Sequence, residues 1–290
     1  MKTTFKFAIL FIFILSAGFS TFAAEKTKKF NQSWPAAGIE TLRISNKFGE
    51  VKFKNDNAST VSINVLVTVE ASSESKATEI INNIDVKINK SGSVVTAETI
   101  FENSFRGNNR FKIDYEINVP SDRNLEVSNK YGNVVVGQLT GKGDFDVQYG
   151  SITAVSLKGI STRINLAYGK GNIDESGNTE IEVAYSDISM GTIGNLRLNS
   201  KYSNIEADKA ADIQTESRYD KFNFGEVVAL NADTKYTQIR VGKLSKKLYI
   251  GAGYGGIKVD NISPDFESIN ITNSYGQINL GLGSASYSLD

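Results

Sequence analysis

The chain contains no cysteine and no histidine. Without them it cannot carry Ser-His-Asp or Cys-His catalysis, zinc held by His or Cys, disulfide bonds, or a lipid attached through an N-terminal Cys. Carboxylate chemistry, Lys or Arg bases and oxygen-ligated calcium remain open. Because the chain can form no disulfide bonds, its folded state must be stabilised by its core.

Long hydrophobic runs are also scarce. Only residues 7–19, which follow Lys2 and Lys6, are strongly apolar, and this stretch is short for a spanning helix. With the small residues after it, the run predicts a secretory signal peptide over residues 1–23, cleaved before Ala24. The alternative is a retained membrane anchor. Contact with a membrane is expected only through the signal peptide before cleavage.

Charge of one sign is not in excess. Removing Lys2 and Lys6 leaves 30 basic residues (32 less 2) against 32 acidic ones, a net charge of −2. This balance argues against bulk nucleic-acid binding. We expect an exported protein of the periplasm, the outer surface or the extracellular space, with no nucleic-acid partner and no assignable oligomeric state.

What the sequence does contain is a tyrosine repeat with an average period of 18 residues (144 residues over eight intervals). The nine positions are Tyr131, Tyr149, Tyr168, Tyr185, Tyr202, Tyr219, Tyr236, Tyr254 and Tyr275. A fixed period of this size indicates stacked units, each too small to bury its apolar face alone. The repeat dictates the architecture of more than half the chain.

Each repeat unit alternates apolar and polar residues on both sides of its Tyr, which is typical of half-buried strands. The residue after the Tyr is Gly, Ser, Asp or Thr, and we expect the chain to bend there. The predicted fold is mainly β: a β-solenoid (a single-stranded β-helix) over residues 121–290, with about 18 residues per coil and a ladder of Tyr rings. The rings could be a carbohydrate-stacking platform, or an inward or corner ladder that sets the register. Their parity with Ile181 and Val183 favours the structural interpretation.

Residues 24–120 break the period and predict a β-rich cap. Alternating residues in 61–69 and 113–119 indicate strands, and helical spacing predicts one helix at about 73–84. Residues 24–36 read as an exposed leader. Residues 44–53 match the Tyr pattern with Phe48 in place of Tyr, so they predict a first coil formed before the cap. Proline occurs only at positions 35, 120 and 264, each at a predicted boundary.

The segment from Ile113 to Gly150 carries the runs YEINVP and LEVSNKYGNV, and residues 46–51 read NKFGEV. These runs resemble the bacterial "putative adhesin" β-strand-repeat family, a domain of unknown function related to the head GIN domain family. The resemblance extends from about residue 37 to the C-terminal end. It implies a signal peptide, a β-helical body and a cell-envelope or surface location, and it brings no catalytic residues.

Candidate catalytic carboxylates are scattered. A lyase-like β-helix enzyme needs an Arg or Lys base beside carboxylate-bound calcium, but Asp144, Asp146 and Asp174 are spread along the chain as solvated acids. The glycine- and aspartate-rich nonapeptide calcium repeat is missing as well. The sequence therefore predicts no catalytic residue, no metal site and no cofactor.

One charged feature stands out. Lys201, Arg218 and Lys235 each precede a Tyr in three successive repeats, so their side chains should form a row, and Arg240 and Lys258 are candidates to extend it across the corner. Like charges about 5 Å apart repel unless acids interleave or a polyanion binds. The candidate interleaving acids are Glu206, Asp208 and Asp220; the alternative is a mixed solvated face.

We therefore expect a secreted or envelope-associated, non-enzymatic β-solenoid scaffold, an adhesin-like surface interaction module whose partner is an acidic polysaccharide or another envelope protein. The alternatives are a polysaccharide-acting β-helix enzyme and a periplasmic accessory module of a membrane signalling system.

Overall fold

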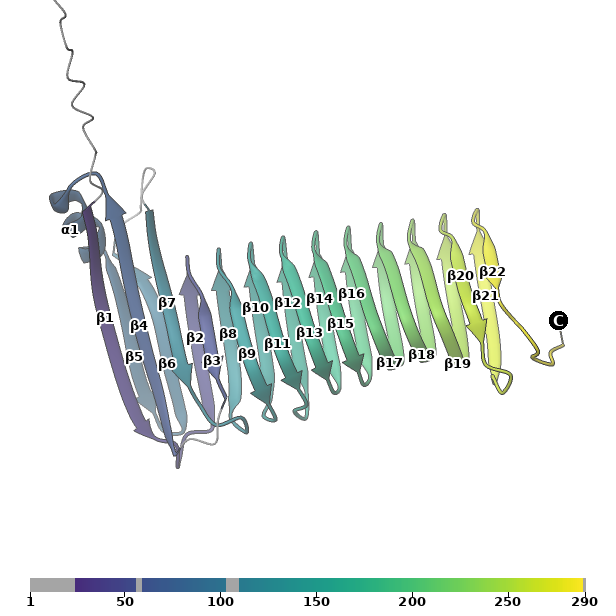
Figure 1. The fold of residues 1–290 in the computed structure, drawn as a ribbon, viewed down its shortest axis with the longest axis horizontal. Coiled ribbons are helices and arrows are strands. Elements are labelled where there is room, and N and C mark those ends of the chain that lie inside the picture. The colour runs from purple at the N-terminus through teal and green to yellow at the C-terminus, as the bar shows by residue number, and fades with distance from the viewer. Residues whose placement is uncertain (1–23, 56–58, 103–109, 289–290) are drawn as a thin grey trace, which may run out of the picture.

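The structure, a computed structural model, describes residues 24–55, 59–102 and 110–288 and is mainly β with one helix. It confirms a β-solenoid joined to an N-terminal antiparallel region (Figure 1). The predicted signal peptide, residues 1–23, lies outside the described residues. No helix within the described ranges has the length and apolar character needed to cross a membrane.

Each solenoid coil contains two strands that meet at an aromatic corner. The first strand runs to the Tyr, and the second leaves it toward the opposite edge. First strands of successive coils pair in parallel into one sheet, second strands pair in parallel into another, and the inward side chains of both sheets form the core. The strands are β8 (Asn124–Lys130), β9 (Val134–Leu139), β10 (Gly143–Gln148), β11 (Ser151–Leu157), β12 (Thr162–Ala167), β13 (Lys170–Ser176), β14 (Thr179–Ala184), β15 (Asp187–Ile193), β16 (Leu196–Lys201), β17 (Asn204–Arg218), β18 (Lys221–Lys235), β19 (Gln238–Gly253), β20 (Ile257–Ile262), β21 (Ser268–Ser274) and β22 (Ile278–Leu280).

The first coil is formed by β2 (Thr41–Lys47) and β3 (Val51–Lys54), with Phe48 at its corner. Strand β2 pairs in parallel with β8, and β3 with β9, so the segment is continuous with the tyrosine coils. The prediction from residues 44–53 is confirmed.

The antiparallel region extends both sheets beyond this first coil. In one sheet β6 (Val94–Phe101) pairs with β2, and β5 (Ile84–Ser91) pairs with β6. In the other, β7 (Arg110–Asn118) pairs with β3, β4 (Thr60–Ala71) with β7, and β1 (Ala24–Pro35) with β4. Helix α1 (Glu74–Asn82), capped by Ser73, confirms the predicted helix and contacts β1, β4 and β5.

The passage from the antiparallel region to the second coil lies at Val119 and Pro120, between β7 and β8. A division of the chain into domains at this point stays a prediction.

The prediction of an exposed leader over residues 24–36 is wrong. Residues 24–35 form strand β1, twelve residues antiparallel to β4. The inward positions of β1 include Lys26 and Lys28, which concealed the alternation of a strand. Lysine stems cover apolar surface while the ammonium groups stay near water, so a Lys can occupy a half-buried strand position.

The two edges of the solenoid differ in regularity. At the aromatic corner, two or three residues separate the strands of every coil. At the opposite edge, two residues separate β15 from β16 and five separate β20 from β21, whereas β17, β18 and β19 run through as continuous bent strands. Most of the variation in repeat length is therefore absorbed at the turn edge, and the tyrosine edge varies by one residue.

Candidate functional site

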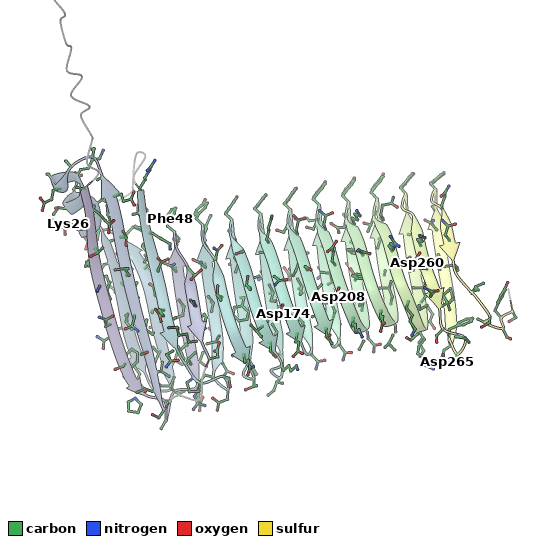
Figure 2. All side chains as sticks on the ribbon, in the orientation of Figure 1. Lys26, Phe48, Asp174, Asp208, Asp260 and Asp265 are labelled. Atoms are coloured by element: carbon green, nitrogen blue, oxygen red, sulfur yellow. The ribbon has the colours of Figure 1, made fainter. Side chains whose placement is uncertain are left out.

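The tyrosines form one stacked ladder along the edge of the solenoid, in the row of side chains that starts near Phe48 (Figure 2). Centroids of neighbouring rings from Tyr149 to Tyr275 lie 4.8–5.0 Å apart, with interplanar angles of 1–11°. The ladder continues through Tyr131 to Phe48 at spacings of 5.1 Å. Stacked rings at one corner of consecutive coils were predicted from the repeat, and they are confirmed.

The rings nevertheless point outward, which the parity argument missed. Tyrosines from Tyr131 to Tyr254 are 46–53% exposed, and all nine have a positive φ of 53–62°. Each Tyr lies between the two strands of its coil, and its left-handed backbone turns the chain there. The inward–outward alternation of the first strand therefore does not continue through the corner. This backbone state costs a non-glycine residue about 1–2 kcal/mol. Stacking, worth about 0.5–1.5 kcal/mol per pair, offsets that cost.

The exposed part of the ladder consists of ring edges and hydroxyls. Nearly parallel rings about 4.9 Å apart cover much of each other's faces, so along the ladder before Tyr275 a sugar has no full ring face on which to stack. Aromatic edges carry partial positive charge, and each phenol can donate or accept a hydrogen bond. The ladder therefore suits hydrogen bonding and anionic groups better than carbohydrate stacking.

The glycines after the tyrosines have a different role from the one predicted. The left-handed conformation belongs to the Tyr, while the glycine permits close approach of consecutive coils. A Cβ added to Gly132 would lie 1.8 Å from the carbonyl oxygen of Gly49, and one on Gly150 would lie 1.9 Å from that of Gly132. Backbone therefore packs directly on backbone at this position.

In four consecutive coils the residue after the Tyr is Ser186, Ser203, Asp220 or Thr237 in place of glycine, and these side chains form a buried polar ladder. The backbone N–H of Gly169 donates to Ser186 Oγ at 3.0 Å, and Ser186 N–H donates to Ser203 Oγ at 3.2 Å. Ser203 N–H donates to Asp220 Oδ1 at 2.7 Å, and Asp220 N–H to Thr237 Oγ1 at 3.3 Å. This ladder connects five coils directly beneath the tyrosines and holds their corners in register.

Asp220 is the centre of this polar ladder. It is 5% exposed, and its Oδ2 accepts hydrogen bonds from Ser200 Oγ at 2.6 Å and Ser217 Oγ at 2.7 Å. Asp220 was a candidate partner for the basic row, but its carboxylate is turned inward and used by these donors. Its role is to support the corner.

The three bases Lys201, Arg218 and Lys235 do form a row. Lys201 pairs in register with Arg218, and Arg218 with Lys235, and all three are exposed beside the tyrosines. Across the described part of the chain, no carboxylate lies within ion-pair distance of any of the three. The candidate interleaving acids, Glu206 and Asp208 included, therefore do not neutralise the row.

A groove of about 770 Å³ runs beside this row on the sheet of first strands. Lys201 and Arg218 line it together with acids one step further from the corner, Asp146, Glu182 and Glu216. Lys130 occupies the same position before Tyr131, and its Nζ lies 5.2 Å from the Tyr131 ring centroid and 5.5 Å from that of Tyr149. A base at this position can thus reach the rings, so the basic row and the ladder form one surface.

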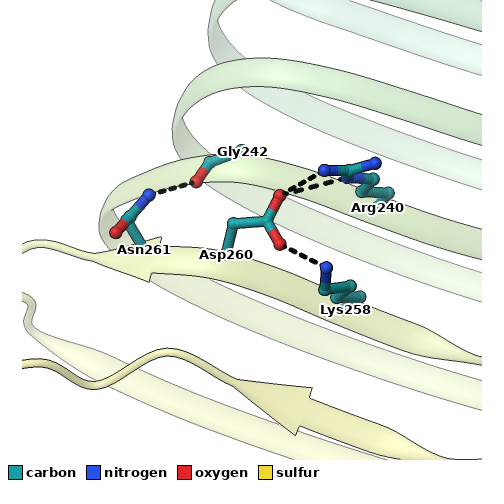
Figure 3. Close-up of polar contacts among 5 residues, drawn as sticks. All are labelled: Arg240, Gly242, Lys258, Asp260 and Asn261. Atoms are coloured by element: carbon teal, nitrogen blue, oxygen red, sulfur yellow. Dashed lines mark hydrogen bonds and ion pairs between the residues drawn. The ribbon is translucent and has the colours of Figure 1, made fainter.

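The predicted extension of the row lies on the other sheet and is neutralised. Arg240 and Lys258 are neighbours in register on β19 and β20. Asp260 binds both: Arg240 Nη2 lies 2.9 Å from Oδ2, and Lys258 Nζ lies 2.8 Å from Oδ1 (Figure 3). The hydrogen bonds from Lys258 and then Arg240 lower the pKa of Asp260. Arg240 and Lys258 therefore do not extend the unpaired row formed by Lys201, Arg218 and Lys235.

Elsewhere on the sheet of first strands, charges of opposite sign alternate along one row of coils, except where Glu126 lies beside Asp144. Arg43 Nε lies 2.6 Å from Glu126 Oε2, and Arg163 Nη2 lies 3.2 Å from Glu180 Oε2, in a row that also includes Asp144. This row lines a shallow groove of about 1060 Å³. Acidic and basic side chains are thus interleaved at the position five residues before the aromatic corner. At the position directly before the Tyr, the three bases stand next to one another without acids between them.

The carboxylates considered for catalysis do not converge. Asp144 lines the groove of the alternating row, Asp146 lines the groove beside the tyrosines, and Asp174 lines a third groove on the other sheet. Within the described ranges, no group of three or more acids lies close enough to hold a metal ion.

No family model matches the chain, and no curated protein matches it either. The chain is similar to crystal structures described as putative adhesins. One, from Parabacteroides distasonis, has a TM-score of 0.43 and 13% identity, covering 81% of this chain and 97% of the other. Another, from Parabacteroides merdae, has a TM-score of 0.43 and 10% identity, covering 87% and 96%.

A third similar structure, described as a putative lipid binding protein from Parabacteroides distasonis, has a TM-score of 0.36 and 11% identity, covering 87% and 96%. Likenesses this distant assign no function, and the resemblance to the head GIN domain family finds no support from a family model.

Proposed function

We propose that the protein is an exported, non-enzymatic scaffold that binds an acidic polysaccharide along its tyrosine-cornered edge. The observation that carries the proposal is the row of Lys201, Arg218 and Lys235, which have no carboxylate partner among the described residues and stand beside an exposed tyrosine ladder. Export rests on the signal peptide predicted over residues 1–23.

The three cations of the basic row repel one another, and a bound polyanion would reduce this electrostatic repulsion. Strand pairing holds three cations at the strand spacing of about 4.8 Å, where like charges on neighbouring strands destabilise each other. The alternating row that contains Arg163 and Glu180 demonstrates that the same sheet accommodates interleaved charges. A repeating anionic chain laid along the edge would meet one cation in each of these three coils, and the phenol hydroxyls would hydrogen-bond its sugar oxygens.

A polysaccharide-acting enzyme is the less favoured alternative. Such an enzyme needs a base and carboxylates around one reacting sugar. Asp144, Asp146 and Asp174 line separate grooves, and this separation favours binding without chemistry.

The test compares polygalacturonate binding by the wild type and by a Lys201→Ser, Arg218→Ser, Lys235→Ser variant. We expect the variant to lose about tenfold or more in affinity, or about 1.4 kcal/mol. Wild-type binding should fade as the Debye length falls from about 10 Å at 0.1 M salt to about 3 Å at 1 M.

The matched control replaces Lys87, Lys142 and Lys243 by Ser. These lysines are exposed and lie away from the aromatic corner, on β5, in the turn between β9 and β10, and on β19, so the control changes net charge equally and leaves the tyrosine edge intact. Equal losses in the two variants would reduce the effect to net charge and contradict the proposal. Equal binding by wild type and first variant would contradict it outright.

A further inference from the structure

The two ends of the solenoid are built differently, beginning with the ladder. At the N-terminal end Phe48 is closed edge-on by Phe111 at 5.0 Å and by Phe101 at 6.0 Å. At the other end, Tyr275 is 82% exposed, against 46–53% for the preceding tyrosines. The outer face of its ring is thus open, whereas every other ring of the ladder has a neighbour on both sides.

The core is also open at the last coil. Strands β21 and β22 pair only with β19 and β20 within the described residues, so their outer edges hold unpaired backbone groups. Inward positions that are fully buried in earlier coils are partly exposed here, as at Ile269 and Ile271, and Ile278 is 44% exposed. After β22 the chain leaves the coil and extends past it along the solenoid axis, so a partner that pairs with this edge must displace residues 281–288 (Figure 1).

The outermost strands at the two ends also differ in their content of charged residues and proline. The outermost strands at the N-terminal end are β1, which carries four charged residues and Pro35, and β5, which carries three charged residues. Charges and proline are the usual means by which exposed edges avoid pairing. Residues 268–289, which include both strands of the last coil, contain no Asp, Glu, Lys or Arg. Within the described residues, the C-terminal edge therefore carries neither the charges nor the proline that hinder pairing with a further strand.

We infer that this edge pairs with the same edge of a second copy, tail to tail. In every coil the first strand runs toward the aromatic corner and the second runs away. A two-fold axis along the strands would therefore place β21 of each copy opposite β22 of the other, antiparallel, as closed symmetric dimers require of a self-complementary patch.

The same axis keeps the aromatic corners of both copies on one side. The two Tyr275 rings then stack on each other, and two ladders of nine tyrosines join into one. Because both edges lack charge, their apposition brings no like charges together. The joint would use the packing that already connects Tyr254 to Tyr275, at 4.9 Å, and bury the exposed isoleucines.

The test measures the mass of the chain from Ala24 onward by sedimentation equilibrium. We expect a dimer for the wild type and a mass one half as large for an Asn270→Lys, Asn279→Lys variant, which charges both outer strands at solvent-exposed positions. The control, Asn231→Lys with Asn223→Lys, places the same charges at the corresponding positions of inner coils and should remain a dimer. A monomeric wild type, or a dimer that persists in the first variant, would overturn the inference.

A single-cysteine experiment tests the orientation. Because the chain has no cysteine, Tyr275→Cys should yield a disulfide-linked dimer under mild oxidation, and Tyr202→Cys, in the middle of the ladder, should not. Equal yields from the two variants would refute the tail-to-tail arrangement, and so would a dimer in which only Tyr202→Cys links. Neither result depends on polysaccharide binding.

Discussion

Substitutions at Tyr202 can separate the stabilisation due to ring packing from the cost of the left-handed backbone at the aromatic corner. Its ring stacks on Tyr185 and Tyr219, both at 4.9 Å, and is 48% exposed, while its backbone has φ of 53°. Alanine removes the ring and keeps the left-handed strain. Glycine removes both, so the pair of variants divides ring energy from backbone energy.

The magnitudes follow from this geometry. A ring that is about half buried removes roughly 100 Å² from water, worth about 2.5 kcal/mol as an upper limit. Two stacking contacts add about 0.5–1.5 kcal/mol each. Because the burial term is an upper limit, we expect Tyr202→Ala to lower the free energy of unfolding by about 3–5 kcal/mol. Tyr202→Gly should lose about 1 kcal/mol less, because glycine adopts positive φ without the left-handed penalty.

The assay is equilibrium unfolding in urea, followed by circular dichroism, for wild type and both variants. Alanine is ordinarily the more stabilising residue inside a strand, so the predicted order, glycine above alanine, is an inversion. An alanine variant as stable as the glycine variant would refute the left-handed corner. A wild-type-like alanine variant would show that ring stacking contributes nothing. In a double-mutant cycle, Tyr202 and Tyr219 should couple by about 0.5–1.5 kcal/mol, and Tyr202 with Tyr149 should be additive.

Three further predictions concern the support of this edge and the region beside it. Gly132→Ala should cost about 1–3 kcal/mol, because its Cβ would lie 1.8 Å from the Gly49 carbonyl oxygen, whereas Gly251→Ala, whose Cβ meets nothing closer than 4.0 Å, should be neutral in the same thermal melts. Asp220→Ala should lower the free energy of unfolding by about 1–3 kcal/mol for each buried donor left without an acceptor, and a variant with wild-type urea stability would contradict the polar ladder. Burial raises the pKa of Tyr115 well above its ordinary value of 10.0, so the folded state retains this proton more tightly than the unfolded state. The stability due to this group is complete below pH 10 and lost as pH rises above it; the urea midpoint should fall more between pH 9 and pH 11 in the wild type than in Tyr115→Phe.

Much of this architecture could be predicted from local patterns. The tyrosine period predicted the length of each coil. The match around Phe48 predicted the first coil, although about 70 residues of the antiparallel region separate it from the next coil in the sequence. Both follow from rules that involve only neighbouring residues, namely strand alternation and a recurring corner. Helix α1 was predicted from the helical spacing of its apolar residues.

What could not be predicted depends on backbone angles and on contacts between coils. Alternation implies that Tyr185 points inward with Ile181, but a left-handed φ at the corner turns the ring outward. The glycine at position 132 was interpreted as a bend because its actual constraint, the carbonyl of Gly49, lies on another coil. The fate of the charged residues was equally hidden: Asp220 turns inward to serines, whereas Asp260 binds two cations.

The contrast between the nearly constant corner and the variable turn edge sets the unit in which this protein can change its size. An in-frame deletion of Tyr202–Arg218, 17 residues, would join Lys201 to Tyr219 and restore the same corner one rung earlier. The solenoid would shorten by about 4.8 Å, the spacing of one strand, with every remaining coil still seated on an equivalent neighbour. Small insertions at the turn edge would leave the ladder untouched. Gene duplication and loss can therefore tune the reach of the tyrosine edge in steps of one rung, independently of the chemistry displayed on each rung.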